Sequence, residues 1–120
     1  MTDHHVGRLA DFPDGDMRIL DLSGRSIGVY RRGDDLYGIL NVCPHRAAPV
    51  CRGEIGGTML PSRPGELEYG MDGLVLRCPW HGWEFDVRSG ECLFDVDSRR
   101  LKTFAVRVSG DDVYCDVEMR

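Results

Sequence analysis

The sequence predicts one all-β domain, a small antiparallel sandwich or barrel. Three observations lead to this fold class: apolar residues mostly recur with a period of two, the alternating stretches are short, and Gly, Pro and Asp turns separate them. No segment has the pattern of a long amphipathic helix. A chain of 120 residues can bury a core without disulfides, so we expect a single domain over residues 1–120.

The first half of the chain contains the first expected strands. Residues 16–22 (DMRILDL) alternate imperfectly and end at a Ser-Gly turn. Residues 26–41 alternate on both sides of the turn Arg32-Gly33-Asp34-Asp35, so we expect them to form a β-hairpin. His4 and His5 precede these stretches in a terminus expected to be mobile, and we assign them no ligand role.

A second hairpin is expected near the C-terminus. Residues 102–108 (KTFAVRV) alternate cleanly, residues 109–112 (SGDD) form a turn, and residues 113–117 (VYCDV) alternate back.

Charge and hydropathy exclude two classes of partner. The net charge of −5 comes from acids spread along the whole chain, which disfavours nucleic acid, because phosphates attract clustered Lys and Arg. No apolar stretch has membrane-spanning length, so we expect no membrane partner. Residues 1–6 lack the basic and apolar segments of a secretory signal.

Two short motifs carry the chemistry of the chain: Cys43-Pro44-His45 and Cys78-Pro79-Trp80-His81. Each follows an expected strand and offers one thiolate and one imidazole. The prolines remove backbone donors and stiffen the turns, and Gly82 allows a backbone conformation that is closed to other residues. Two rigid loops at neighbouring strand ends can clasp one metal centre from opposite sides.

Two kinds of metal centre suit this donor set. Two sulfur and two nitrogen ligands can hold one tetrahedral zinc, or the two irons of a [2Fe–2S] cluster in which histidines replace two cysteines. Zinc ligands are usually separated by two to four residues within each half, whereas Cys-x-His leaves only one. Zinc is therefore the second interpretation.

The motifs and the residues after the second one, Gly82-Trp83-Glu84-Phe85-Asp86, resemble the Rieske [2Fe–2S] family. The resemblance is strongest to soluble Rieske ferredoxins and oxygenase-associated Rieske domains, and it covers residues 36–108 directly. It implies one Rieske-type cluster in a cluster-binding part over about residues 41–96, formed by two loops. By this resemblance Cys43 and Cys78 hold the buried iron, and His45 and His81 hold the outer iron.

The chain departs from the family pattern between the motifs. Thirty-two residues separate His45 from Cys78, roughly twice the usual gap. Residues 56–73 contain two prolines and several glycines, account for the excess, and are expected to be a loop insertion. An insertion in a surface loop costs little free energy, so we expect the site to remain intact.

The neighbours of the ligands are expected to set the reduction potential. Respiratory Rieske proteins add a cysteine to each loop and join the two as a disulfide; here Trp80 occupies the second position and Cys51 is displaced from the first. Those proteins also donate hydrogen bonds from a serine and a tyrosine, where this chain has Trp83 and Phe85. Fewer donors stabilise the added electron less, which predicts a potential near the low end of the family's range. The other expected neighbours of the cluster are Pro44, Arg46, Pro79 and Gly82.

Three cysteines remain outside the motifs. Because Cys51, Cys92 and Cys115 cannot all pair, we expect free thiols in a reducing, cytoplasmic compartment. Cys92 and Cys115 are expected to be small buried residues, which leaves Cys51, in the cluster loop, as the thiol to test for reactivity. Arg46 and Arg52 flank the first loop. They either form a docking patch for a partner or are simply solvated charges.

These features predict an electron carrier rather than an enzyme. A Rieske oxygenase also needs an iron held by two histidines and a carboxylate, and the four histidines of this chain leave no such set. We therefore expect a soluble Rieske-type ferredoxin that carries single electrons from a flavin reductase to an oxygenase or another redox enzyme. Two alternatives stay open: a Rieske-fold accessory subunit of a larger oxidoreductase, and a zinc-stabilised interaction module.

Overall fold

The computed structural model describes residues 3–43, 49–61, 67–79, 83–93 and 100–117. Within these ranges the regular elements are strands apart from two short 3-10 helices, which confirms the predicted all-β class. The strands are β1 (Asp3–Arg8), β2 (Met17–Leu22), β3 (Arg25–Arg32), β4 (Asp35–Leu40), β5 (Glu54–Pro61), β6 (Leu67–Arg77), β7 (Glu84–Asp86), β8 (Thr103–Phe104), β9 (Val106–Ser109) and β10 (Asp112–Asp116). Two single-turn 3-10 helices, η1 (Leu9–Asp11) and η2 (Val50–Arg52), join them. Neither described helix has the length and apolarity that crossing a bilayer requires.

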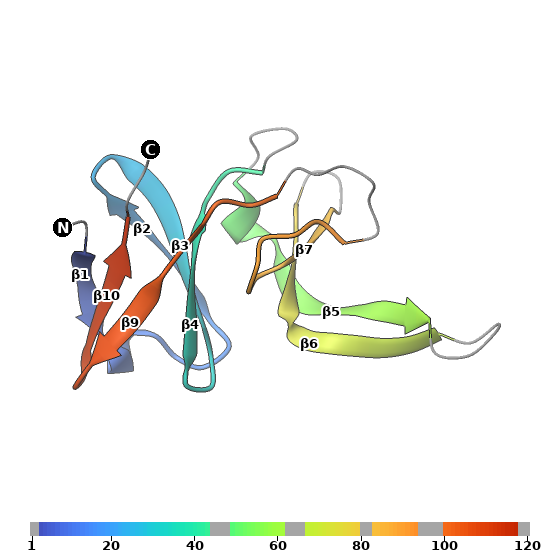
Figure 1. Cartoon of the computed structure of the whole chain (residues 1–120), viewed down its shortest axis with the longest axis horizontal. Coiled ribbons are helices and arrows are strands. Elements are labelled where there is room, and N and C mark those ends of the chain that lie inside the picture. Colours follow the sequence, from blue (N-terminus) through green and yellow to red (C-terminus); the bar gives the residue numbers. More distant parts are fainter. Residues whose placement is uncertain (1–2, 44–48, 62–66, 80–82, 94–99, 118–120) are drawn as a thin grey trace.

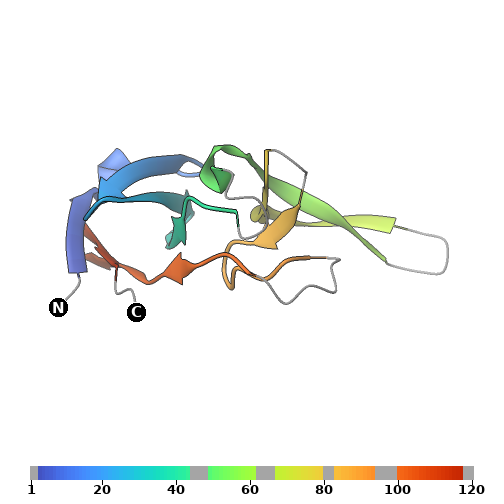
Figure 2. The same cartoon turned by 90° about the horizontal axis from the view of Figure 1, so that it is seen from above.

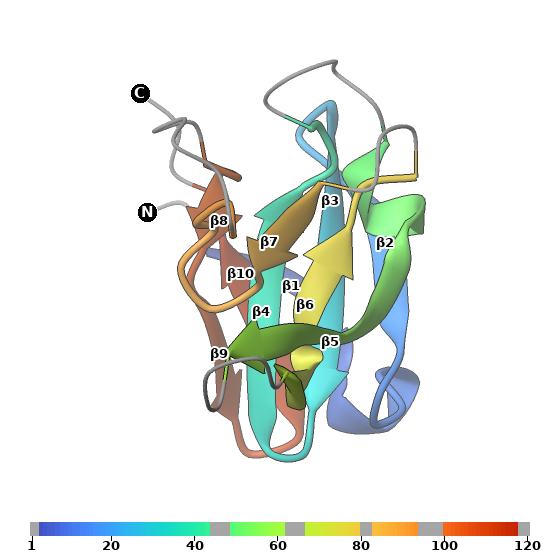
Figure 3. The same ribbon diagram turned by 90° about the vertical axis from the view of Figure 1, so that its right-hand side faces the viewer.

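The strands form three antiparallel sheets, in the orders β1-β10-β9, β2-β3-β4-β8 and β5-β6-β7. The first two sheets lie together at one end of an elongated molecule of 48 × 28 × 21 Å, and the third lies at the other end (Figures 1 and 2). A view along the long axis shows β5, β6 and β7 in front of β3 and β4 (Figure 3). The first sequence motif lies in the connection from the second sheet to the third, and the second motif lies between β6 and β7 of the third sheet.

The predicted hairpins are confirmed. β2 and β3 pair up to Leu22 and Arg25, and the turn between them places Ser23 and Gly24 at φ values of 56° and 79°. Positive φ at both central residues is the geometry whose twist matches that of the flanking strands. β3 pairs with β4, and β9 pairs with β10, as the alternating patterns predicted.

The expected strand over residues 102–108 is divided between two sheets. β8 pairs with β4, where Phe104 lies opposite Gly38, whereas β9 pairs with β10. Ala105 stands between them, and its carbonyl accepts a hydrogen bond from the backbone N–H of Asp116. An alternating pattern shows which residues face the core, but it does not show which strand they pair with.

The prediction that residues 56–73 form a loop is wrong, because most of this range is a β-hairpin. Thr58–Pro61 pairs with Leu67–Gly70, and a second ladder joins Glu54–Gly56 to Val75–Arg77. Between the ladders β6 has four residues where β5 has one, a bulge at which the hairpin bends (Figure 1). Pro61 is compatible with a strand because β5 is at the edge of its sheet, where a missing N–H breaks no ladder.

The terminus expected to be mobile is strand β1. His4 and His5 pair with Cys115 and Tyr114 of β10, and His5 Nε2 lies 3.0 Å from Asp112 Oδ1. The absence of a ligand role for the two histidines stays a prediction.

One hydrophobic core joins the two ends of the molecule. It combines Tyr30 and Ile39 of the β3–β4 hairpin with Leu76 of β6 and Phe85 of β7, and both motif cysteines belong to it. Tyr30 also donates a hydrogen bond of 2.7 Å from its hydroxyl to the carbonyl of Gly73, at the β6 bulge. Two smaller core clusters, around Ile27 and around Val29, fill the space between the first two sheets.

Gly28 of β3 makes room for the thiol of Cys51. A Cβ atom at Gly28 would lie 2.5 Å from Cys51 Sγ and 2.8 Å from Met17 Sδ. We predict that Gly28→Ala lowers the free energy of unfolding by about 1–3 kcal/mol through overpacking. Chemical denaturation of Gly28→Ala, Cys51→Ala and the double variant measures this. Gly28→Ala should lower the free energy of unfolding by less when Cys51 is already alanine. Strictly additive effects of the two substitutions would contradict the contact between Gly28 and the Cys51 side chain.

Candidate metal centre

The two motif cysteines lie at the ends of neighbouring elements. Cys43 follows the end of β4 by three residues, and Cys78 comes directly after the last residue of β6. Both side chains are 1% exposed and belong to the same core, together with Val50 and Phe85. The structure therefore brings two thiol donors from distant parts of the sequence into one apolar interior.

The second motif is held at both ends by the β6–β7 pairing. The backbone N–H of Cys78 donates to the carbonyl of Trp83 over 2.8 Å. One step outward, Arg77 lies opposite Glu84 in the ladder, and their side chains form an ion pair of 2.8 Å. The segment between these anchors is short, so the strand pairing fixes where the second loop begins and ends.

Several sequence-predicted site residues lie outside the described residues. They are Pro44, His45, Arg46, Trp80, His81 and Gly82. Within the described ranges, no group of three or more His, Cys, Asp or Glu side chains forms a metal-ligand set. Both motif imidazoles fall outside those ranges, so the four-ligand set predicted from the sequence stays a prediction.

The described neighbours of the cysteines differ in exposure. Phe85 is fully buried in the shared core, and Trp83 is half-buried and packs against it. Pro79 is exposed and, with Cys78, lines an open groove of about 370 Å³. The apolar side chains therefore lie on the inner side of Cys78, and the groove lies on its outer side.

Gly53 couples the two ligand segments, a contact that the sequence motifs do not reveal. It follows η2, and a Cβ atom on it would overlap the carbonyl oxygen of Arg77, the residue before Cys78. Its N–H donates to the carbonyl of Val50 over 3.0 Å. Only a residue without a side chain permits this approach, so glycine at this position lets η2 lie against the end of β6.

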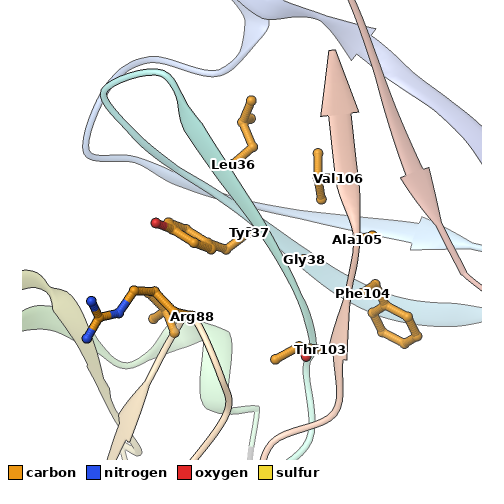
Figure 4. A pocket seen from close by; sticks show the side chains of 9 residues that line it. Leu36, Tyr37, Gly38, Arg88, Thr103, Phe104, Ala105 and Val106 are labelled. Carbon is orange, nitrogen blue, oxygen red and sulfur yellow. The ribbon is translucent and has the colours of Figure 1, made fainter.

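A separate groove of about 400 Å³ lies between β4, the β8–β9 segment and the residues after β7 (Figure 4). Tyr37, Phe104 and Arg88 are among the residues that line it. Arg88 is engaged by Asp86 through bonds of 2.9 and 3.1 Å. Although burial opposes the effect, this guanidinium holds the pKa of Asp86 below its ordinary value. None of the lining residues belongs to either motif.

All five cysteines lie in the described part of the chain, and none forms a disulfide. Burial raises the pKa of Cys51 to about 12 and that of Cys115 to about 11. The thiolate is the reactive form of cysteine, so both thiols are inert near neutral pH. Cys115 is fully buried, as predicted, whereas Cys92 is only partly buried.

Comparison with known proteins identifies the family. The sequence profile of the Rieske [2Fe–2S] domain matches residues 2–105. The chain belongs to the Rieske [2Fe–2S] domain family. It is 25% identical to the ferredoxin component of a naphthalene 1,2-dioxygenase system from Pseudomonas aeruginosa, over 98% of this chain and 99% of that protein.

Solved Rieske structures share the fold. The ferredoxin of carbazole 1,9a-dioxygenase from Nocardioides aromaticivorans IC177 matches 98% of this chain and all of its own, with 24% identity and a TM-score of 0.76. A chain from a complex of reduced oxygenase and oxidised ferredoxin in carbazole 1,9a-dioxygenase matches with 27% identity and a TM-score of 0.75. That match covers 99% of this chain and 96% of the other.

The described residues fit the cofactor of a Rieske domain, one [2Fe–2S] cluster. Cys43 and Cys78 supply two soft sulfur donors, the ligands that iron–sulfur clusters take from proteins. Their apolar surroundings, including Phe85 and Leu76, exclude water from the sulfur side of the site.

The thiol environments predict a clear order of alkylation. At pH 8 a thiol with a pKa of about 12 is ionised to roughly one part in ten thousand. We therefore expect iodoacetamide to label Cys92 before Cys51 and Cys115 in the native protein, and labelling of Cys51 to rise with pH. Peptide mass spectrometry of timed reactions measures this order. Early labelling of Cys51 at pH 8 would show that its thiol is accessible and ionised.

Proposed function

We propose that this chain is a Rieske-type ferredoxin, a diffusible carrier of single electrons between redox enzymes. The observation that carries the proposal is its match in length to ferredoxin components, since it spans 99% of the Pseudomonas aeruginosa relative. The matched length is that of one Rieske domain, whose profile covers residues 2–105.

We propose that Cys43 and Cys78 hold one iron and that His45 and His81 hold the other. The burial of both thiols in one core supports the cysteine assignment. The histidine assignment rests on the motif spacing. When bound, the cluster supplies the site with a centre that takes up one electron and releases it again.

The chain's own residues decide from which side electrons exchange. Leu76, Phe85 and Val50 pack around the cysteines and close the interior to solvent and to partners. Electrons would therefore enter and leave through the histidine side, which is the proposed contact surface for both partners.

The proposed donor is a flavin reductase, and the proposed acceptor is an oxygenase or another redox enzyme. A structural relative is a ferredoxin component of a dioxygenase, and a related complex contains oxygenase and ferredoxin. A carrier must release each partner, so we expect a small, transient interface. The net charge of −5 would favour partners with basic docking faces and make the rate dependent on salt.

We propose a reducing, cytoplasmic location. The support is the state of the cysteines: Cys51, Cys92 and Cys115 form no disulfide, although an oxidising compartment favours disulfides.

The first test is spectroscopic. We expect anaerobically purified protein to be red-brown and to give a rhombic Rieske-type electron paramagnetic resonance signal after reduction by dithionite. Cys43→Ser and Cys78→Ser should lose the signal, because each removes a proposed ligand. Cys115→Ala is the matched control, a third buried cysteine that belongs to a separate core cluster and should leave the signal in place.

Two results would contradict the proposal. A colourless protein that contains stoichiometric zinc after attempted cluster reconstitution would make the site structural. A stable complex with a larger oxidoreductase, recovered from the native source at high salt, would favour an accessory subunit over a diffusible carrier.

The buried aromatic at position 85 predicts a low reduction potential. Phe85 has no hydroxyl with which to donate to a cluster sulfur, so we expect a potential near −150 mV, the low end of the range for Rieske centres. Phe85→Tyr adds a donor and should raise the potential. Protein-film voltammetry measures both values, and Phe85→Leu controls for altered packing. A respiratory-type potential in the unaltered protein would refute this account.

A further inference from the structure

Asn41 occupies an unusual position in both sequence and structure. It is the only asparagine of the chain, which contains no glutamine, so it supplies the only side-chain carboxamide. It follows the last residue of β4 and precedes Cys43 by two positions. The first ligand segment therefore begins at this residue.

The carboxamide of Asn41 bonds in two directions. Its oxygen accepts a hydrogen bond of 2.8 Å from the backbone N–H of Cys51. Its nitrogen lies 3.1 Å from the hydroxyl oxygen of Ser26, to which it donates. The backbone N–H of Asn41 also donates to the carbonyl of Ser26, over 2.9 Å. One side chain thus ties the start of the ligand segment to its end and to strand β3.

The far end of the segment has its own anchor. Cys51 is 4% exposed, its thiol lies 3.7 Å from the carbonyl oxygen of Ile39, and the space that receives it exists because residue 28 is glycine. From Cys51 the η2 turn continues to Gly53, which lies against the carbonyl of Arg77, next to Cys78. A continuous chain of contacts therefore runs from Asn41 to the second ligand segment.

We infer that Asn41 is a positioning residue for the cluster, which through its two side-chain hydrogen bonds fastens the backbone at Cys51 to the end of β4 and to β3. This inference rests on the proposed function, since it concerns the same site. Cys51, Cys43 and Cys78 form no disulfide, so the fastening of the first ligand segment to β3 and to β6 depends on non-covalent contacts. Asn41 supplies one of these contacts, two positions before Cys43.

The test compares Asn41→Ala with Asp21→Ala. Asp21 makes a hydrogen bond of the same kind, with its carboxylate 3.0 Å from the backbone N–H of Gly24, but it lies in the β2–β3 turn. Asn41→Ala and Asp21→Ala therefore remove similar hydrogen bonds, one next to the proposed cluster site and one farther from it. Asn41→Asp is the rescue variant, because it keeps the acceptor for Cys51. Ser26→Ala removes only the hydrogen bond between the Asn41 carboxamide and the Ser26 hydroxyl. It replaces Asn41→Ala in the comparison if that variant does not fold.

Four readouts are measured on the purified protein: hydrogen exchange at the Cys51 amide, the rate of iron loss to a chelator, the reduction potential and the g values of the reduced state. We expect Asn41→Ala to exchange and to lose iron about tenfold faster than the parent, with altered g values and a shifted potential. Asp21→Ala should match the parent in all four. Asn41→Asp should restore slow exchange and iron retention, and Ser26→Ala should give an intermediate loss rate.

The outcomes separate this inference from the function on which it rests. If the parent carries the cluster and Asn41→Ala behaves like Asp21→Ala, Asn41 does not position the ligand segment. If the parent carries no iron, the proposed function fails, and the exchange rate of the Cys51 amide still reports whether Asn41 fastens the backbone at Cys51. Faster exchange with unchanged g values and potential would also overturn the inference, because it would show a structural bond without influence on the cluster.

Discussion

The burial of Cys43 and Cys78 in a core shared by two sheets is the constraint on which the rest of the structure depends. Cysteines bind iron–sulfur clusters as thiolates. A buried thiolate without a partner is costly, because the apolar interior does not solvate its charge. In such an interior, a bound metal is what stabilises the thiolate form. The β3–β4 hairpin supplies one wall of this core, and the β6–β7 pair supplies the other. Folding the two ends of the molecule together therefore also brings the two motif cysteines into one interior.

Such an arrangement requires close backbone approach, and glycines provide it. Gly28 admits the side chain of Cys51, and Gly53 lets η2 lie against the strand that ends at Cys78. Tyr30 adds a long-range hydrogen bond to the bulge of β6. These contacts are directional and short, whereas the surrounding apolar packing is not. Together they give Cys51, η2 and the end of β6 defined relative positions that hydrophobic burial alone would leave adjustable.

Local patterns predicted the parts of the fold that local forces determine. Hairpins with short turns, such as β3–β4 and β9–β10, follow from alternation and from residues that accept positive φ. The same reasoning failed for residues 56–73, because glycine and proline are turn residues in general but are tolerated at a bulge and at a sheet edge. The two motif cysteines could be singled out from the sequence because the spacing of their motifs is rare, and the structure buries both in one core. Asn41 was missed because its role depends on Cys51 and Ser26, which only the folded chain brings near it.

The pairing of β1 with β10 places both ends of the described chain in one sheet, at the end of the molecule opposite the β5–β6 hairpin (Figure 1). Neither strand contributes a residue to the core that holds the cysteines. Additional polypeptide joined at either end would therefore extend away from the metal centre. The architecture is suited to covalent linkage with another redox domain, in which a tether would replace diffusion while the junction stays remote from the core that contains the motif cysteines.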